Sequence, residues 1–500
     1  MLRNRGHRMR TTSFVLLAGI LTACGTPAAA PTVPSADQAI ARVAAGLRPG
    51  IVIKGAPPLT YSLAERMAHY KVPGVSIALV DSGRIVWARG YGLKESGTSD
   101  SVTPATLFQA ASISKPVAAT ALLHLVEEGK LALDTPVNEY LKSWKLPDNK
   151  LTAKEKVTLR RIVAHFAGLT VHGFPGYAAG DSIPTVPQIL DGVKPANTPA
   201  VRVETVPGTV WNYSGGGITI EQLAMMDVTG EAFPALVKRL VLDPIGMTNS
   251  GYDQPLPAGK KGQEAAGYRP DGKMVEGRWH TYPEMAAAGL WTTPTDLLKW
   301  AMEITAARAG KSTKVLSQKM ATEMLTVQKA PSGLGPMLHG SGHAFYFEHG
   351  GANEGYRCDV MYFPEIGRGA AVMTNSDAGS AVAQEILYAL ASEYRWPDYA
   401  PREIEPVALD SMVAIDLVGD YPLPAKLVGG ALARTVMIRR EGGKLTIEAE
   451  GIIPKAELVA LSPTKLIAPE GGLEATIDLG KNGKVTGIEI GGTKLVKKGK

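Results

Sequence analysis

The chain has 500 residues, of which 45% are hydrophobic and 20% charged, a composition that fits a globular protein of two or three domains. Its formal net charge is +6, but four arginines lie among the first ten residues, and without them 49 basic residues stand against 47 acidic ones. Elsewhere the sequence has no run of basic residues interleaved with aromatic ones, which excludes a nucleic-acid partner.

Residues 1–23 have the layout of a signal peptide, because a basic start is followed by the apolar residues 14–21, too few to span a bilayer as a mature helix. Residues 21–24, Leu-Thr-Ala-Cys, resemble the lipobox of bacterial lipoproteins, which implies cleavage before Cys24 and attachment of lipid to it. Ordinary cleavage near the same small residues is the alternative. The resemblance implies a protein anchored to a membrane of the bacterial cell envelope, facing the periplasm or the exterior. Residues 24–56 are then a tether, rich in alanine and proline at its start, and an N-terminal extension.

The region 57–396 begins and ends with strand-like patterns. Alternating apolar residues over 74–91, interrupted by turn residues, predict one β-hairpin, and the stretch 357–375 predicts a second. A helical pattern follows over 381–394, and helical segments with Gly/Pro loops fill the middle of the region. Strands from both ends that close one sheet predict an α/β domain, in which an antiparallel sheet is flanked by helices and carries a helical subdomain.

The segment 395–406 is rich in proline and ends this pattern. Beyond it, short strands alternate with turn signals such as Asn482-Gly483, which is typical of a tight hairpin. Residues 405–500 are enough for a small antiparallel β-barrel, and they contain no cluster of side chains that suggests catalysis.

A serine and a lysine three residues apart, Ser112 and Lys115, open a long apolar segment. The pattern predicts a helix from about Ser112 to Gly129, in which Pro116 is tolerated because it falls near the first turn. Residues i and i+3 share a helix face, so the Lys115 amine can reach the Ser112 hydroxyl, and the helix start adds a positive partial charge beside it. A serine needs a neighbouring base to become a nucleophile. The alternative is a helix-capping serine beside a lysine that extends to solvent.

Other serines fit catalysis less well. Ser462 and Lys465 have the same spacing, but a strand and a turn follow them, so this lysine is not held one helical turn above its serine. No Gly-x-Ser-x-Gly sequence marks a strand-to-helix turn, and the nearest match, around Ser76, lies within an alternating strand. Ser112 is therefore the candidate nucleophile.

Two later segments complete a pattern. The sequence PGTVWNYSGGG carries Tyr213, and FEHGGANEGYR carries His349 directly before a strand. With them, about residues 57–395 resemble the serine β-lactamase and penicillin-binding protein superfamily, specifically the class C β-lactamase-like hydrolases. The C-terminal module resembles the small lipocalin-like β domain often appended to such enzymes. The resemblance implies that Ser112 is acylated and that Lys115 and Tyr213 form a coupled pair, either member of which can be the general base.

The resemblance also implies an oxyanion hole and a substrate groove. The backbone N–H groups of Ser112 and Ala352 would bind the developing oxyanion. Gly350 and Gly351 would let the edge strand come close to a substrate, because glycine has no side chain in the way.

Two positions depart from the β-lactamase pattern. Gly215 stands where β-lactamases have an asparagine that binds an acyl-amide side chain, and His349 stands where they have a lysine that binds a carboxylate. His349 is mostly neutral at pH 7, and we expect it to take up a proton at about pH 5.5. Both departures weaken the recognition of carboxylated amides and leave the acylation machinery complete.

The sequence thus predicts a serine hydrolase that acts through an acyl-enzyme, in the first place an esterase on small neutral esters or on a related acyl or amide substrate. A β-lactamase or a D-amino-acid or DD-peptidase acting on cell-wall-type amides is the alternative. A non-catalytic ligand-binding protein of the envelope is the alternative of another class. No cofactor and no metal is expected, because the histidines lack zinc-site spacing. His165 is interpreted as a hydrogen-bonded residue at a helix end, and Cys358 as a packed core residue.

Overall fold

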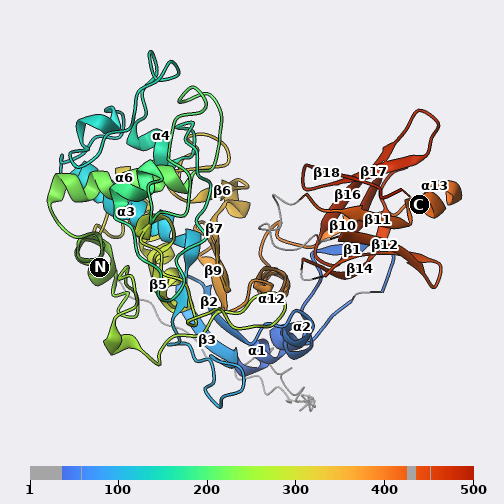
Figure 1. Cartoon of the computed structure of the whole chain (residues 1–500). Coiled ribbons are helices and arrows are strands. Elements are labelled where there is room, and N and C mark those ends of the chain that lie inside the picture. The colour runs from blue at the N-terminus through green and yellow to red at the C-terminus, as the bar shows by residue number, and fades with distance from the viewer. Residues whose placement is uncertain (1–35, 58, 425–434, 451, 500) are drawn as a thin grey trace, which may run out of the picture.

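The computed structural model describes residues 36–57, 59–424, 435–450 and 452–499, which form a larger α/β domain and a smaller β-barrel (Figure 1). The signal-like segment and the lipid attachment expected at Cys24 lie outside these residues. Among the helices of the described ranges, none combines the length and the hydropathy that a membrane span requires.

The larger domain is built on a six-stranded antiparallel sheet in the order β3-β2-β9-β8-β7-β6. Its strands are β2 (Gly74–Asp81), β3 (Arg84–Gly92), β6 (Met337–His339), β7 (Tyr346–Asn353), β8 (Tyr356–Phe363) and β9 (Arg368–Thr374). The N-terminal hairpin β2–β3 pairs with β9, where Val75 lies opposite Thr374. Strands from both ends of the domain therefore close one sheet, which confirms the α/β architecture expected from the sequence.

Helices cover both faces of this sheet. Along β2, Ile77 and Leu79 point into one apolar cluster, whereas Ala78 and Val80 point into another, which is why every residue of the strand but the last is buried. The first face carries α1 (Ala36–Ala45), α2 (Leu63–His69) and α12 (Gly379–Tyr394). The second face carries α10 (Pro294–Arg308) and the inserted helical region.

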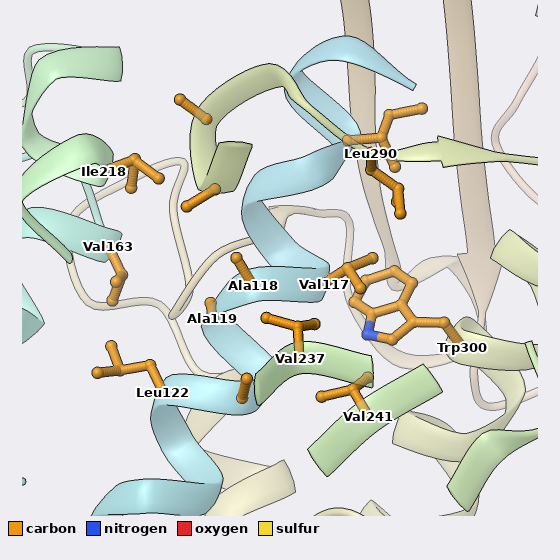
Figure 2. Close-up of a cluster of buried hydrophobic side chains, with 14 of the residues drawn as sticks. Val117, Ala118, Ala119, Leu122, Val163, Ile218, Val237, Val241, Leu290 and Trp300 are labelled. Carbon is orange, nitrogen blue, oxygen red and sulfur yellow. The ribbon is translucent and has the colours of Figure 1, made fainter. Parts of the chain in front are cut away.

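The helical region surrounds α3 (Ser114–Glu127), which is apolar on nearly every side and is buried accordingly. In Figure 2, Val117 and Leu122 of this helix lie among apolar side chains of the surrounding segments. The helix stops before Gly129 as expected, but its start differs, because Ala111–Ile113 form a separate 3-10 turn ahead of it. The other elements of the region are α4 (Leu159–Val163), α5 (Val186–Asp191), α6 (Gly215–Thr229), α7 (Phe233–Val237), α8 (Asp243–Ile245), α9 (Met285–Ala288), α11 (Gln318–Met324), β4 (Phe108–Gln109) and β5 (Trp291–Thr292).

The C-terminal body is an antiparallel barrel of eight strands, each paired with the next along the chain. The backbone N–H of Lys498 donates to the carbonyl of Asp420 at 2.8 Å, so the first and last strands meet and nearly close the barrel. A short helix and the eight strands make up this body: α13 (Ser411–Leu417), β11 (Gly419–Pro422), β12 (Thr435–Glu441), β13 (Lys444–Ala449), β14 (Ile453–Ala460), β15 (Lys465–Ala468), β16 (Leu473–Leu479), β17 (Val485–Ile490) and β18 (Thr493–Val496). The barrel expected from the sequence is confirmed.

A short parallel strand pair joins the two bodies, β1 (Ile51–Ile53) with β10 (Arg402–Ile404). Ile51 of this pair packs against Ile467 of the barrel. The end of the N-terminal extension, together with α1, is therefore folded against the rest of the protein, whereas the start of the expected tether lies outside the described residues.

A buried cation also lies at this junction. The Arg66 Nη2 atom is 2.7 Å from the carboxylate of Glu385 on α12 and 2.8 Å from that of Glu470 in a barrel turn. A cavity of about 970 Å³ opens beside it, between α2, α12 and the barrel, and its lining includes Tyr70 and Tyr388. None of the catalytic residues expected from the sequence lines this cavity.

Candidate active site

Ser112 and Lys115 lie side by side where α3 begins. The Lys115 Nζ atom lies 2.9 Å from the Ser112 hydroxyl oxygen and donates a second hydrogen bond, 2.8 Å long, to the carbonyl of Ala287 in α9. Only 3% of Lys115 is exposed, whereas Ser112 is partly accessible. The amine at the entrance of this buried helix is therefore held between a serine and a backbone carbonyl, away from water.

The turn before α3 holds Ser112 on an unusual backbone. Ala111 has a φ of +50°, a conformation that residues with a side chain seldom adopt. Ser114 fixes this turn, because its hydroxyl donates to the Ala111 carbonyl and accepts from the backbone N–H of Leu290 at 3.0 Å. Strain of this kind persists where surrounding contacts determine the backbone, and it is concentrated at active sites.

Tyr213 lies beside the same lysine. The centroid of its ring is 4.9 Å from Lys115 Nζ. Tyr213 directly precedes α6, which begins where the Ser214 hydroxyl accepts a hydrogen bond from the N–H of Gly217 at 2.9 Å. Two segments distant in sequence thus bring Ser112, Lys115 and Tyr213 together.

His165 packs against Tyr213 and is 1% exposed. The centroids of the two rings lie 4.2 Å apart, with 35° between the ring planes. The backbone N–H of Ser214 donates to His165 Nδ1 at 3.3 Å, so the ring carries its proton on Nε2, which has no partner among the described residues. Burial and the charge of Lys115 hold the pKa of His165 well below its usual range. His165 is thus a neutral ring that positions Tyr213, nearer to the chemistry than its place after a helix suggested.

His349 lies on β7 close to the same tyrosine. Its ring centroid is 6.3 Å from that of Tyr213, and only 4% of the residue is exposed. Its Nδ1 donates to the carbonyl of Gly350 at 2.7 Å, which leaves Nε2 as a buried acceptor without a partner in the described part of the chain. Burial, and to a lesser extent the charge of Lys115, lowers the pKa of His349 to about 4. The expectation that this residue takes up a proton at about pH 5.5 is therefore wrong, because burial beside a lysine disfavours the positive form.

Strand β7 passes close to the turn that carries Ser112. Strand β6 pairs with β7 only over Tyr346–Glu348. Within the part of the chain that the structure describes, the rest of β7 has no strand partner on that side and contacts the 3-10 turn Ala111–Ile113. A Cβ atom on Gly351 would lie 2.2 Å from the carbonyl oxygen of Ala110, so the close approach of the two segments requires glycine here. Ala352 follows on the exposed side of the strand, and its part in an oxyanion hole with Ser112 stays a prediction.

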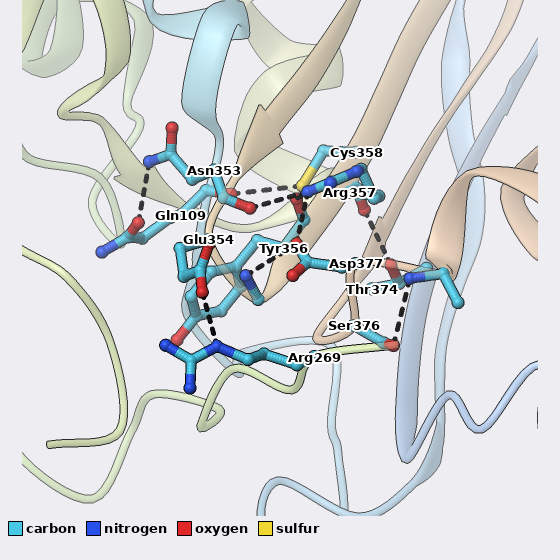
Figure 3. A network of polar contacts seen from close by, with 12 residues as sticks. Gln109, Arg269, Asn353, Glu354, Tyr356, Arg357, Cys358, Thr374, Ser376 and Asp377 are labelled. Carbon is cyan, nitrogen blue, oxygen red and sulfur yellow. Dashed lines mark hydrogen bonds and ion pairs between the residues drawn. The ribbon is translucent and has the colours of Figure 1, made fainter. Parts of the chain in front are cut away.

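A buried hydrogen-bond network ties the end of β7 to the segment that leads to Ser112 (Figure 3). The Asn353 amide donates to Gln109 Oε1 at 2.7 Å and to the carbonyl of Ala288 at 3.0 Å. The Cys358 thiol donates to the Gln109 carbonyl at 3.2 Å, and this cysteine is a packed core residue as expected. Asn353 was not among the residues expected at the site, although it lies only four residues after His349.

Two buried carboxylic acids also went unrecognised in the sequence. Glu221 on α6 and Glu284 before α9 are fully buried, and neither has a hydrogen-bond partner for its carboxylate oxygens within the described ranges. Burial raises the pKa of each to about 8, although the charge of Lys115 partly opposes this in Glu221. Both are therefore mostly uncharged at pH 7.

Gly215 begins α6, two residues after Tyr213. A Cβ atom at this position would lie 2.9 Å from Cε2 of Phe174, whose ring fills the space beside it. On the same loop, His172 Nδ1 bonds to the carbonyl of Tyr213 at 2.5 Å. The sequence showed that an asparagine is missing here, but not that the ring of Phe174 lies against Gly215.

The chain is similar to known proteins over most of its length. Residues 62–394 match the family model described as Beta-lactamase. The chain is 25% identical over 418 residues to a D-aminopeptidase of Gluconobacter oxydans (strain 621H), a match that covers 79% of this chain and 75% of that protein. It is 28% identical over 204 residues to the esterase EstB of Burkholderia gladioli, covering 38% of this chain and 49% of the esterase.

Several of these matches are partial. The chain spans 60% of the length of the unguisins hydrolase ungD of Aspergillus violaceofuscus (strain CBS 115571) and 45% of that of the putative penicillin-binding protein PbpX of Bacillus subtilis (strain 168). Among solved structures, the octameric penicillin-binding protein homologue from Pyrococcus abyssi is similar with a TM-score of 0.58 at 24% identity, covering 87% of this chain and 98% of that one. At this identity the likeness shows the fold.

Proposed function

Because the chain belongs to the beta-lactamase family, whose members are serine hydrolases, we propose that it hydrolyses small neutral esters, or closely related acyl compounds, through an acyl-enzyme on Ser112. The observation that carries this proposal is the contact of 2.9 Å between Lys115 Nζ and the Ser112 hydroxyl, in surroundings that keep water from the lysine. A serine in direct contact with a potential base is the usual arrangement of an activated nucleophile.

In the proposed reaction, Ser112 Oγ attacks the acyl carbon of the ester while its proton passes to the pair formed by Lys115 and Tyr213. The bond between the acyl carbon and the alcohol oxygen breaks, and the alcohol leaves with that proton. Water then attacks the acyl-enzyme and gives one proton to the same pair, and the carboxylic acid is released as the proton returns to Ser112. The N–H groups of Ser112 and Ala352 would stabilise the negative oxygen formed in both steps.

The residues at two positions, 349 and 215, support the preference for neutral substrates. A cation at position 349 would attract the carboxylate of a β-lactam, but His349 is buried and uncharged because its pKa lies at about 4. At position 215, where an asparagine would bind an acyl amide, Gly215 offers no side chain. Neither change touches the contact between Ser112 and Lys115 on which acylation depends.

The test compares three substrates, p-nitrophenyl butyrate, nitrocefin and D-alanine p-nitroanilide, with the wild-type protein and with Ser112→Ala. We expect the wild-type protein to show its highest kcat/KM with the ester, and Ser112→Ala to turn over none of the three substrates. If the wild type cleaves nitrocefin faster than the ester at about pH 8, where His349 is neutral, the protein is better described as a β-lactamase.

A D-aminopeptidase is the second candidate, supported by the relative from Gluconobacter oxydans, whose match covers 79% of this chain. Fast release of p-nitroaniline from the D-alanine substrate would favour it. A non-catalytic ligand-binding protein is the third, and a single covalent adduct of Ser112 with a fluorophosphonate would exclude it.

The proposal includes a location. The basic start, the short apolar stretch and the small residues before Cys24 support secretion followed by lipid attachment, which would anchor the protein to the bacterial envelope.

A further inference from the structure

Phe174 and Gly215 fit against each other beside the candidate site. A Cβ atom on Gly215 would lie 2.9 Å from Cε2 and 3.5 Å from Cδ2 of Phe174, and 3.3 Å from the carbonyl oxygen of His172. Real Cβ atoms are essentially never found closer than 3.0 Å to another heavy atom, so no side chain fits at position 215 while the ring stays in place. Phe174 is only partly buried.

The loop that carries Phe174 is held on both sides of the ring. Before it, His172 Nδ1 bonds to the carbonyl of Tyr213 at 2.5 Å, which links the loop to a proposed catalytic residue. After it, the carbonyl of Pro175 accepts a hydrogen bond from His280 Nδ1 at 2.8 Å. The position of the ring relative to Tyr213 is therefore set by contacts of its own loop.

We infer that Phe174 selects the acyl group of the substrate, an inference that rests on the proposed hydrolysis through Ser112. In the β-lactamase pattern, the asparagine at the position of Gly215 binds an amide in the acyl side chain. Here Gly215 has no side chain and the edge of the Phe174 ring lies against it, and an amide placed against that edge loses water without gaining a comparable partner. The site therefore favours plain alkyl acyl groups over acyl groups of the same length that carry an amide.

The ring also limits the size of the acyl group. The Phe174 ring lies beside Gly215, so replacing Phe174 by alanine opens a hollow next to Gly215. Acyl chains too long for the wild-type site should enter this hollow. The inference thus makes two separate predictions, one about polarity and one about length.

The experiment uses the full chain with p-nitrophenyl esters. Pentanoate and N-acetylglycinate esters have acyl groups of equal length, of which only the second carries an amide, and butyrate and octanoate differ in length alone. The variants are Phe174→Ala, Gly215→Asn and the double variant. The matched control is Phe345→Ala, which removes another half-buried phenylalanine ring, one that lies 5.4 Å from the Arg308 guanidinium.

In the double variant, the ratio of kcat/KM for N-acetylglycinate to that for pentanoate should rise about tenfold over the wild type. In Phe174→Ala, the ratio for octanoate to butyrate should rise several-fold. Gly215→Asn alone should lose activity on every ester, because the new Cβ atom collides with the Phe174 ring. Adding Phe174→Ala should restore this activity, so the effects of the two substitutions are not additive. Phe345→Ala should leave both ratios at the wild-type values.

Equal changes for all esters in Phe174→Ala, with no rescue of Gly215→Asn, would overturn the inference and make the ring a structural filler. Failure of the proposed ester hydrolysis can be told apart from failure of this inference. If no ester is turned over but Ser112 still reacts with a fluorophosphonate, the preference for alkyl over amide-bearing groups is measured from the inactivation rates of an alkyl and an amide-bearing fluorophosphonate. Unchanged ratios in that assay also overturn the inference.

Discussion

The side-chain amide of Asn353 donates to Gln109 Oε1 at 2.7 Å and so joins the end of β7 to the strand that leads into the turn of Ser112. The same amide donates to the carbonyl of Ala288, next to the carbonyl that binds the lysine of the site. One side chain therefore links the three segments that set the distances between the proposed nucleophile, its proposed base and the edge strand.

Replacing Asn353 by alanine should lower kcat for the preferred ester about tenfold with little change in KM, because small displacements of reacting groups slow catalysis. The free energy of unfolding should fall by about 1–3 kcal/mol, since buried acceptors lose their donor. The control is Asn138→Ala, which removes hydrogen bonds of 2.8 and 2.9 Å to the backbone of Leu146 outside the site. Urea unfolding should show similar losses of stability in the two variants. Steady-state kinetics should show a reduced kcat only in Asn353→Ala. An equal loss of kcat in both would reduce Asn353 to a purely structural role.

Ser112→Ala should abolish ester turnover and labelling by a fluorophosphonate, because it removes the hydroxyl that Lys115 contacts. The free energy of unfolding should change by no more than about 1 kcal/mol. Ser462→Ala is the matched control with the same spacing to a lysine. The Ser462 hydroxyl accepts the backbone N–H groups of Lys465 at 3.0 Å and Thr464 at 3.3 Å in a turn, so this variant should keep full activity. Mass spectrometry of the labelled protein checks both, and an adduct that survives in Ser112→Ala would reassign the nucleophile.

His349 should make the folded protein less stable in acid. Its pKa is about 4 in the folded chain, against about 6.5 in the unfolded chain, so between these values only the unfolded state binds the proton. The stability present above about pH 6.5 is lost as the pH falls toward 4, by up to about 3 kcal/mol.

The test is urea unfolding of wild type and His349→Gln at a series of pH values. The variant should show a shallower loss of stability over this range, although His165, whose pKa is also held low, keeps part of the slope. An identical slope in both proteins would contradict the assignment. The activity ratio of ester to nitrocefin in the wild type should stay the same between about pH 8 and 5.5, since His349 is neutral throughout.

Arg66→Met should lower the free energy of unfolding by about 3–5 kcal/mol, because it leaves the buried carboxylate of Glu385 without its charged partner. Replacing Glu385 by glutamine in the same chain should recover part of the loss. Arg402→Met provides the contrast, since both members of the pair between Arg402 and Glu474 are more than half exposed and such pairs contribute about 1 kcal/mol or less. Denaturant unfolding of the full chain measures all three, and equal losses for Arg66 and Arg402 would show that burial does not matter here.

Cys24→Ser should prevent incorporation of labelled lipid and move the protein from the detergent phase to the aqueous phase. Cys358→Ser is the control, because this thiol is buried on β8 and cannot be reached by a lipid-transferring enzyme. Wild-type protein recovered without lipid would show that cleavage follows an ordinary signal peptide.

Local patterns predicted much of the fold and the centre of the site. The contact between Ser112 and Lys115 follows from spacing on one turn, and the hairpins follow from alternation and turn residues. Contacts between distant segments carry no such local signal, as with Asn353 and Gln109, which are 244 residues apart in the chain. The low pKa that keeps His349 neutral at mildly acidic pH likewise comes from burial in the packed interior, which the neighbouring residues in the sequence do not predict.

The N-terminal helix and the candidate active site lie on opposite faces of the central sheet. Helix α1, where the described chain starts, packs with α12 on one face, whereas the turn of Ser112 borders the other face through β7 and β8. We expect the membrane anchor proposed above, which would precede α1, to attach on the side of the sheet opposite Ser112. Substrates arriving from the surrounding medium should reach a tethered molecule as readily as a released one.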